Sequence, residues 1–172
     1  MKAVVVYESM YGNTHQVADA IGRGLAASGE VVVVAVAQAA PALVADVDLL
    51  VVGGPTHAHG MSRPSTRKAA VDQAKDNPIE PAAAGAGVRE WLETVAPVET
   101  SSAAFDTRAG VAPAFLTGRA SKGIAKQLHQ HGFRQVAEPE SFLVDKDNHL
   151  EPGEEQRAEE WGARLAAAVT PG

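Results

Sequence analysis

Short Val-rich runs recur in the first third of this sequence and leave few folds open to it. They span Ala3–Tyr7, Val31–Val36 and Val47–Val52. Their apolar residues follow one another instead of alternating with polar ones, which is typical of strands that are covered on both faces. The runs therefore predict parallel strands inside a layered α/β domain.

The segment between the first two runs predicts a helix over Thr14–Ser28. Val17, Ile21 and Leu25 recur at every fourth position on one face, and Gly29 ends the pattern. A helix that joins two parallel strands forms a right-handed crossover. We therefore expect a strand–helix–strand unit at the start of the chain.

Later segments continue this alternation, so we expect an open, doubly wound parallel sheet of about five strands with helices on both faces. The expected elements are a strand at Ala103–Asp106, a helix at Ser121–His131, a final strand at Gln135–Val136 and Ser141–Val144 that is broken near Pro139, and a last helix at Glu154–Val169.

The length of 172 residues indicates one domain, spanning residues 1–172. Between Gly54 and Ser101 the only helix-like pieces are Thr66–Ala74 and Val88–Val95, and a Pro/Ala/Gly-rich stretch, Asn77–Gly87, separates them. We interpret the region around 61–100 as a mobile helical or linker connection over one sheet edge.

Composition and charge exclude several classes of function. The formal net charge is −6, which disfavours nucleic-acid binding because phosphate contacts need a cationic surface. The sequence has no Cys, so disulfides, thiolate nucleophiles and Cys-ligated metals are excluded. The chain opens directly into a short apolar run without a long signal-peptide core, so we expect a cytoplasmic protein that does not enter the membrane.

Residues Glu8 to Thr14 connect the first predicted strand to the first predicted helix. Free backbone N–H groups and the helix dipole make such a turn suitable for a phosphate group. Ser9 and Thr14 supply hydroxyls, Gly12 allows a tight turn, and Asn13 can cap the helix. The turn contains no Lys or Arg, so we expect neutral dipoles to hold the anion.

Two other phosphate-binding motifs do not fit this turn. A triphosphate-binding loop requires Gly-x4-Gly-Lys-[Ser/Thr], which the sequence lacks. A dinucleotide site requires Gly-x-Gly-x-x-Gly here and an acidic residue near the end of the second strand, where the sequence has Ala35-Val36-Ala37-Gln38.

Ser9-Met10-Tyr11-Gly12-Asn13-Thr14 resembles the phosphate loop of the flavodoxin family, roughly [Ser/Thr]-x-[Thr/Ser/Tyr]-Gly-Asn-Thr after the first strand. The form in this chain looks especially like the flavodoxin domains of larger diiron flavoproteins. The resemblance implies an FMN cofactor and the sheet order 2-1-3-4-5. It also implies that the loop binds FMN through Ser9, Met10, Tyr11, Gly12, Asn13 and Thr14.

Gly53–Thr56, at the end of the third predicted strand, is similar to the family's Gly-x-Pro-[Thr/Val] segment beside the flavin ring. The resemblance implies FMN contacts in the loop that follows, from Pro55, Thr56, His57, Ala58, His59 and Gly60. His57 or His59 is hypothesised to contact the flavin ring and to make its potential depend on pH near neutrality. No neighbouring set of ligands completes a metal site around these two histidines, so none is predicted.

The strand at Ala103–Asp106 is expected to deliver Asp106, Thr107 and Arg108 to the same edge as further FMN contacts. Arg108 has two interpretations, as a partner for a ligand carbonyl or for Asp106. The family commonly stacks aromatic rings on the flavin, but neither later loop, as predicted, contains one. Tyr11 is the available substitute, and weaker FMN binding would follow from the missing rings.

A cluster of basic residues, Arg63, Arg67 and Lys68, follows the third-strand loop. These residues could dock an acidic redox partner or a dinucleotide phosphate, or they could be the solvated start of a helix, which is the more usual case.

Three functions remain open from the sequence. The leading prediction is an FMN-binding electron-transfer protein that serves redox partner proteins, a reductase or an acceptor, as a monomer or weak homodimer. The second is an FMN-dependent NAD(P)H:quinone or porphyrinogen-type oxidoreductase. The third is a binding or regulatory module of flavodoxin fold without flavin. The sequence shows no dedicated protein nucleophile or acid–base pair, as expected if a cofactor carries the chemistry. We predict an electron carrier in preference to a stand-alone enzyme.

Overall fold

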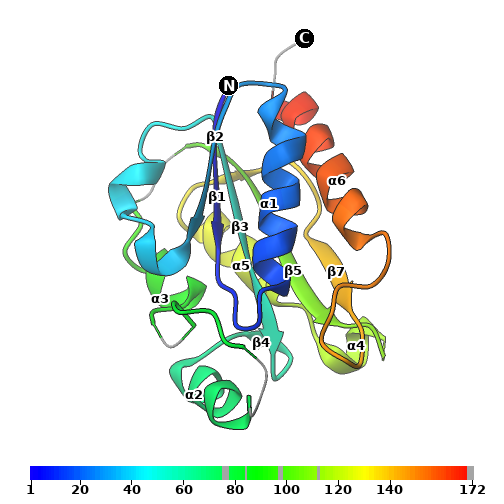
Figure 1. Ribbon diagram of the computed structural model, residues 1–172. Coiled ribbons are helices and arrows are strands. Elements are labelled where there is room, and N and C mark those ends of the chain that lie inside the picture. Colours follow the sequence, from blue (N-terminus) through cyan, green and yellow to red (C-terminus); the bar gives the residue numbers. More distant parts are fainter. Residues whose placement is uncertain (75–77, 84, 97–98, 112, 170–172) are drawn as a thin grey trace.

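The computed structural model describes residues 1–74, 78–83, 85–96, 99–111 and 113–169. Its strands form one sheet between two helical layers (Figure 1). The strands are β1 (Lys2–Tyr7), β2 (Glu30–Ala35), β3 (Leu49–His57), β4 (Gly60–Met61), β5 (Ser101–Ala109), β6 (Arg134–Gln135) and β7 (Glu140–Val144). The α-helices are α1 (Asn13–Ala26), α2 (Pro64–Gln73), α3 (Val88–Leu92), α4 (Ala114–Thr117), α5 (Ala120–Gln130) and α6 (Glu154–Val169), and two 3₁₀ turns, η1 (Val36–Gln38) and η2 (Pro41–Val44), follow β2.

The sheet has the predicted doubly wound order. Its path is β2-β1-β3-β5, and both β6 and β7 pair with β5 in parallel. β6 and β7 therefore act as one last strand that is interrupted around Pro139, as expected. Among the strands that the structure describes, β4 is the one that runs antiparallel, in a hairpin with β3.

Two strands extend further than the sequence predicts. Gly54 and Pro55 pair in register with Asp106 and Thr107, so β3 runs on to His57 and β5 to Ala109. Gly and Pro predict the end of a strand because they have low strand propensity. Here pairing with β5 overrides that preference, and the segments expected to be loops belong to the sheet.

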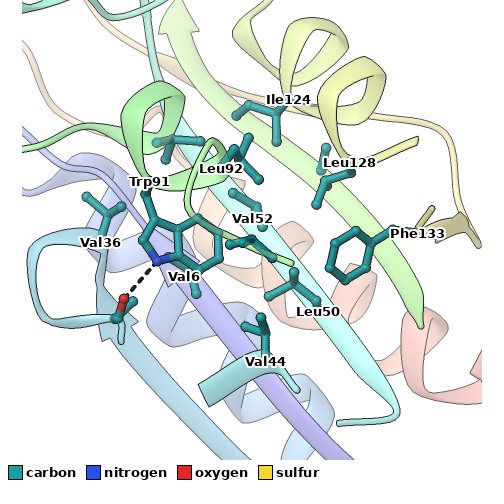
Figure 2. Close-up of a cluster of buried hydrophobic side chains, with 14 of the residues drawn as sticks. Val6, Val36, Val44, Leu50, Val52, Trp91, Leu92, Ile124, Leu128 and Phe133 are labelled. Atoms are coloured by element: carbon teal, nitrogen blue, oxygen red, sulfur yellow. Dashed lines mark hydrogen bonds between the residues drawn. The ribbon is translucent and has the colours of Figure 1, made fainter. Parts of the chain in front are cut away.

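Helices cover both faces of the sheet. α1 and α6 lie together on one face, while α3 and α5 pack on the other (Figure 1). The core on the α3–α5 face includes Val6, Leu50, Val52 and Leu92 around the indole of Trp91 (Figure 2). The Trp91 Nε1–H donates a hydrogen bond to the Ala39 carbonyl oxygen at 2.7 Å, which satisfies the buried polar atom of the ring.

The connection from 61 to 100 contains the two expected helices, with α3 shorter than predicted. Its described parts contact the sheet, since the backbone N–H of Val88 donates to Glu8 Oε2 at 2.9 Å. The stretch Asn77–Gly87 lies partly outside the described residues, and mobility of the connection stays a prediction. Among the described residues, no helix is both long enough and apolar enough to cross a bilayer.

Candidate functional site

A cavity of about 570 Å³ opens where the parallel strands end. This edge of an open α/β sheet is where such folds bind ligands, and the volume is typical of small-molecule sites. Four segments line it: the loop into α1, the end of β3, the end of β5 with the residues after it, and the loop after β7. The lining residues are Ser9, Met10, Tyr11, Asn13, Thr14, Pro55, Thr56, His57, Thr107, Arg108, Ala109, Val111, Val144, Asp145, Lys146 and Asn148.

The loop after β1 closes on itself through Ser9. The Ser9 Oγ accepts a hydrogen bond from the Gly12 N–H at 3.1 Å, and the Ser9 side chain is buried. Gly12 has φ 95°, a left-handed conformation that a side chain would strain. The turn therefore requires glycine at position 12, and this requirement explains the Gly of the motif.

The first turn of α1 faces the cavity. Gly12 is the N-cap, and within the described part of the chain no side chain caps the helix. The prediction that Asn13 caps α1 is wrong, because Asn13 is the first helical residue and its Nδ2 donates to the Asn148 carbonyl oxygen at 3.0 Å and to Asn148 Oδ1 at 3.2 Å. The uncapped N–H groups and the helix dipole leave partial positive charge at this end.

Thr14 and Thr107 join the helix to the sheet at the bottom of the cavity. Their Oγ1 atoms lie 2.7 Å apart and both side chains are buried. One hydroxyl donates to the other, so the second retains a proton that it can donate to a ligand. The pair places the end of β5 against the N-terminal end of α1.

His57 lines the cavity from the end of β3. Its Nδ1 lies 3.3 Å from Thr66 Oγ1, while the Thr66 hydroxyl donates to the Arg63 carbonyl oxygen at 3.0 Å. These bonds favour the tautomer with the proton on Nδ1. Burial lowers the pKa of His57, with a further lowering by the Arg67 charge and an opposing effect from Glu8. His57 is therefore a neutral imidazole at physiological pH.

Five predicted residues do not line the cavity. They are Gly12, Ala58, His59, Gly60 and Asp106. Ala58 and His59 form the tip of the β3–β4 hairpin with φ 44° and 75°. The two predicted histidines are thus separated, and only His57 faces the cavity.

Asp106 is directed away from the cavity. Asp106 is fully buried and its carboxylate is bonded at the start of α5, so it does not reach the cavity that Thr107 lines. The Asp106 Oδ2 accepts a hydrogen bond from the Ser121 N–H at 2.7 Å, and burial raises the pKa of this carboxyl group. Asp106 thereby supports the start of α5 instead of contacting the cavity.

The loop after β7 is a wall of the cavity that the sequence interpretation missed. It contributes Asp145, Lys146 and Asn148, in a stretch that reads only as the turn into the last helix. Lys146 lines the cavity beside the predicted Arg108, and the expectation that neutral dipoles hold the anion stays a prediction. No local motif marks these residues, because the fold brings them to the first loop from far along the chain.

Tyr11 and Phe115 bear on the expectation that stacking rings are missing. Tyr11 lines the cavity, and its hydroxyl donates to the Ala70 carbonyl oxygen in α2 at 2.9 Å. Because β5 continues to Ala109, the connection after it begins at Gly110 and includes Phe115, whose exposed fraction is 84%. This connection therefore does contain an aromatic ring.

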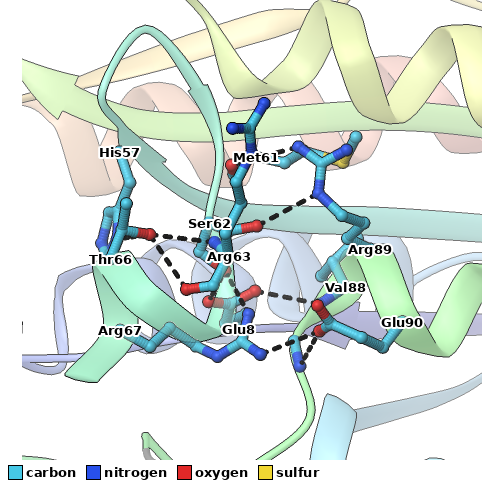
Figure 3. A network of polar contacts seen from close by, with 11 residues as sticks. Glu8, His57, Met61, Ser62, Arg63, Thr66, Arg67, Val88, Arg89 and Glu90 are labelled. Carbon is cyan, nitrogen blue, oxygen red and sulfur yellow. Dashed lines mark hydrogen bonds and ion pairs between the residues drawn. The ribbon is translucent and has the colours of Figure 1, made fainter.

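A buried polar network lies beside the cavity (Figure 3). Glu8 accepts a hydrogen bond from the Ser62 hydroxyl, which in turn accepts one from Arg67 Nη1 at 2.8 Å. Arg67 Nη2 pairs with Glu90 Oε2 at 2.9 Å, and only 4% of Arg67 is exposed. Arg67 is thus a structural residue, not part of a basic docking surface.

Among the described residues, no group of three or more His, Cys, Asp or Glu side chains is arranged to hold a metal ion.

Comparison with known proteins agrees with this geometry. The flavodoxin family model matches residues 5–92. A flavodoxin from the domain Archaea superposes with a TM-score of 0.69 at 22% identity, covering 98% of this chain and 99% of its own. Flavodoxin 1 from Bacillus cereus gives a TM-score of 0.69 at 16% identity, covering 99% and 100%.

A larger protein has the same fold in one part. The rubredoxin oxygen:oxidoreductase of the anaerobe Desulfovibrio gigas superposes with a TM-score of 0.67 at 19% identity, covering 98% of this chain but 36% of its own. No curated protein matches the sequence.

The open parallel sheet, with its ligand cavity at the carboxyl ends of the strands, defines a doubly wound nucleotide-binding protein. The chain belongs to the flavodoxin family, whose members bind FMN and transfer electrons. It is accordingly an FMN-binding, electron-transfer protein of the flavodoxin type.

Proposed function

We propose that the cavity holds FMN with its phosphate at the first turn of α1 and its ring toward the end of β3. The observation that carries this proposal is the uncapped N-terminus of α1, which faces a cavity of about 570 Å³ together with buried hydroxyls. Backbone N–H groups from the loop, with the hydroxyls of Thr14 and Thr107, would hold the phosphate.

Other lining residues have distinct roles in this proposal. Pro55, Thr56 and His57 would lie along the ring, and Tyr11 would supply an aromatic surface near it. The Thr56 hydroxyl is already engaged, because its Oγ1 accepts from the Ala120 N–H at 2.9 Å, so Thr56 would contribute its backbone and methyl group. Bound FMN supplies the redox chemistry, since it accepts and returns one or two electrons. The chain binds and orients the ring and limits its access to water.

We propose an electron carrier, not a stand-alone enzyme. The net charge of −6 suits docking on a basic reductase or acceptor. Among the described side chains that line the cavity, burial lowers the pKa of His57, and backbone hydrogen bonds from His149 and Asp147 lower the pKa of Asp145 and hold it to its own loop. We expect a cytoplasmic monomer or weak homodimer with no nucleic-acid partner.

An absorption spectrum of the purified protein, followed by identification of the released flavin, tests the proposal. We expect flavin absorbance and FMN as the released compound. A colourless protein that stays colourless after incubation with FMN would contradict it.

A second assay separates a carrier from an enzyme. The loaded protein is mixed with NADPH or NADH and a quinone, without any partner protein. We expect no sustained turnover until a flavin reductase is added, and turnover by the protein alone would favour the quinone-reductase alternative.

A further inference from the structure

A second cavity lies beside the proposed FMN cavity, on the other side of Asn13. This second cavity, about 280 Å³ in volume, is lined by Asn13, by residues 149–153 after β7 and by two side chains of the helices. Asn13 lines both cavities, whereas Asn148 lines the first and His149 the second. The contact between Asn13 and Asn148 therefore lies between the two cavities.

This contact is a double hydrogen bond in a buried position. The Nδ2 of Asn13 donates to the Asn148 carbonyl oxygen at 3.0 Å and to its Oδ1 at 3.2 Å. Only 7% of Asn13 is exposed. Breaking the contact would leave a buried amide without its partners, which is unfavourable.

The loop that carries Asn148 is held in place from within. Asp145 Oδ1 accepts hydrogen bonds from the N–H groups of Asp147 and His149, both at 2.9 Å. Asn148 itself has φ 65°, a left-handed conformation that Asn adopts more easily than most residues. The loop thus presents Asn148 to α1 in one conformation.

We propose that the Asn13–Asn148 bridge selects a flavin mononucleotide over a flavin dinucleotide. The inference rests on the proposed function, since it assumes the phosphate at the first turn of α1. A dinucleotide carries a second phosphoryl group and an adenosine beyond that phosphate. To continue past the first turn of α1, they would have to displace the bridge.

Carboxylates on the far side of the Asn13–Asn148 bridge also disfavour the second phosphoryl group. The second cavity is lined by Glu151 and Glu155, and Glu155 is paired with Arg23 at 2.7 Å. A second phosphoryl group there would approach these two carboxylates. The bridge and these carboxylates therefore both disfavour binding of the flavin dinucleotide.

The test is a titration of the flavin-free full chain with FMN and, separately, with FAD. Quenching of flavin fluorescence reports binding in both titrations. We expect FMN to bind at least about 100-fold more tightly than FAD. Asn13→Ala removes both hydrogen bonds and should narrow this ratio by at least about 10-fold. Asn148→Gly keeps the left-handed conformation, removes one acceptor and should narrow the ratio less.

Asp147→Ala is the matched control, because the exposed Asp147 lies on the same loop and lines neither cavity. It should leave the ratio unchanged. Equal affinities of the natural sequence for FMN and FAD, or a ratio unchanged in both asparagine variants, would overturn the inference and leave FMN binding intact. Failure to bind either flavin would instead overturn the proposed function.

Discussion

Thr14 and Thr107 show how single residues far apart in the sequence form one site. They are 93 positions apart, yet their hydroxyl oxygens lie 2.7 Å from each other in the buried end of the cavity. The loop motif identifies Thr14, whereas Thr107 becomes its neighbour only because β5 and α1 meet at this sheet edge.

Thr14→Val tests the contribution of this hydroxyl pair. The substitution keeps the shape of the side chain but removes one hydroxyl from the proposed phosphate site, so we expect about 10-fold weaker FMN binding. Titration of the flavin-free protein measures it. Thr117→Val, on the exposed α4 surface, is the control and should bind as the natural sequence does. A Thr14→Val affinity within about twofold of the natural one would contradict the assigned role.

His57 predicts a pH dependence of stability. Its pKa in the folded protein lies below the ordinary value of 6.5, so the unfolded chain takes up a proton at higher pH than the folded chain does. The free energy of unfolding should therefore fall as the pH decreases below 6.5. His57→Asn should remove this part of the decrease.

Urea unfolding of His57→Asn and the natural sequence at about pH 7.5 and 5.5 measures the effect, since these values bracket the ordinary pKa of histidine. His59→Asn is the control, because this exposed residue at the hairpin tip lies outside the cavity. If both variants lose stability with acid as steeply as the natural sequence does, the assignment to His57 is wrong.

At the scale of elements, the buried network explains how α2 and α3 attach to the sheet. Glu8 follows β1, Ser62 follows β4, Arg67 belongs to α2 and Glu90 to α3. Hydrogen bonds connect all four segments, so they hold the described parts of the connection beside the cavity (Figure 3).

Arg67→Met tests this attachment. It leaves the buried Glu8–Ser62 pair and Glu90 without their cation, so we expect a loss of about 3 kcal/mol in the free energy of unfolding. Lys68→Met, in an exposed pair with Asp72, should lose less than about 1 kcal/mol. Urea unfolding measures both, and similar losses for the two variants would show that the network does not anchor these helices.

The ends of the strands are the part of the fold that sequence patterns predict least well. The Val-rich runs predict β1 and β2 to within a residue or two, because unbroken apolar sequence marks both strands directly. The expectation of cover on both faces holds for β1, whereas β2 is an edge strand whose Val side chains are only partly buried. The sequence predicts only Ala103–Asp106 for β5, whereas the strand spans Ser101–Ala109. The added residues are mostly polar or small, and backbone pairing with β3 and β7 makes them a strand.

At the scale of the whole molecule, net charge governs how the protein meets a partner. The formal charge of −6 should accelerate association with a basic reductase at low ionic strength. We expect the second-order rate of reduction to fall at least about 10-fold when the salt concentration rises from about 10 mM to about 500 mM. Stopped-flow measurement with a basic flavin reductase gives this rate.

The control oxidises the reduced protein with ferricyanide, a small anion. Like charges repel, so this reaction should keep its rate or become faster with salt. A reductase reaction that is insensitive to salt would contradict electrostatic docking.

The sequence by itself determined the layered α/β class, the order of the first strands and helix, and the phosphate loop, because burial pattern and turn chemistry are local properties of neighbouring residues. The tertiary structure alone decided which distant side chains complete the cavity. Lys146 and Asn148 reach the first loop because parallel strands all end at one edge. Asp106 does not line the cavity because its carboxylate is buried and bonded to the start of α5. Such relations depend on strand register and length, which backbone pairing sets between segments that carry no mutual signal in the sequence.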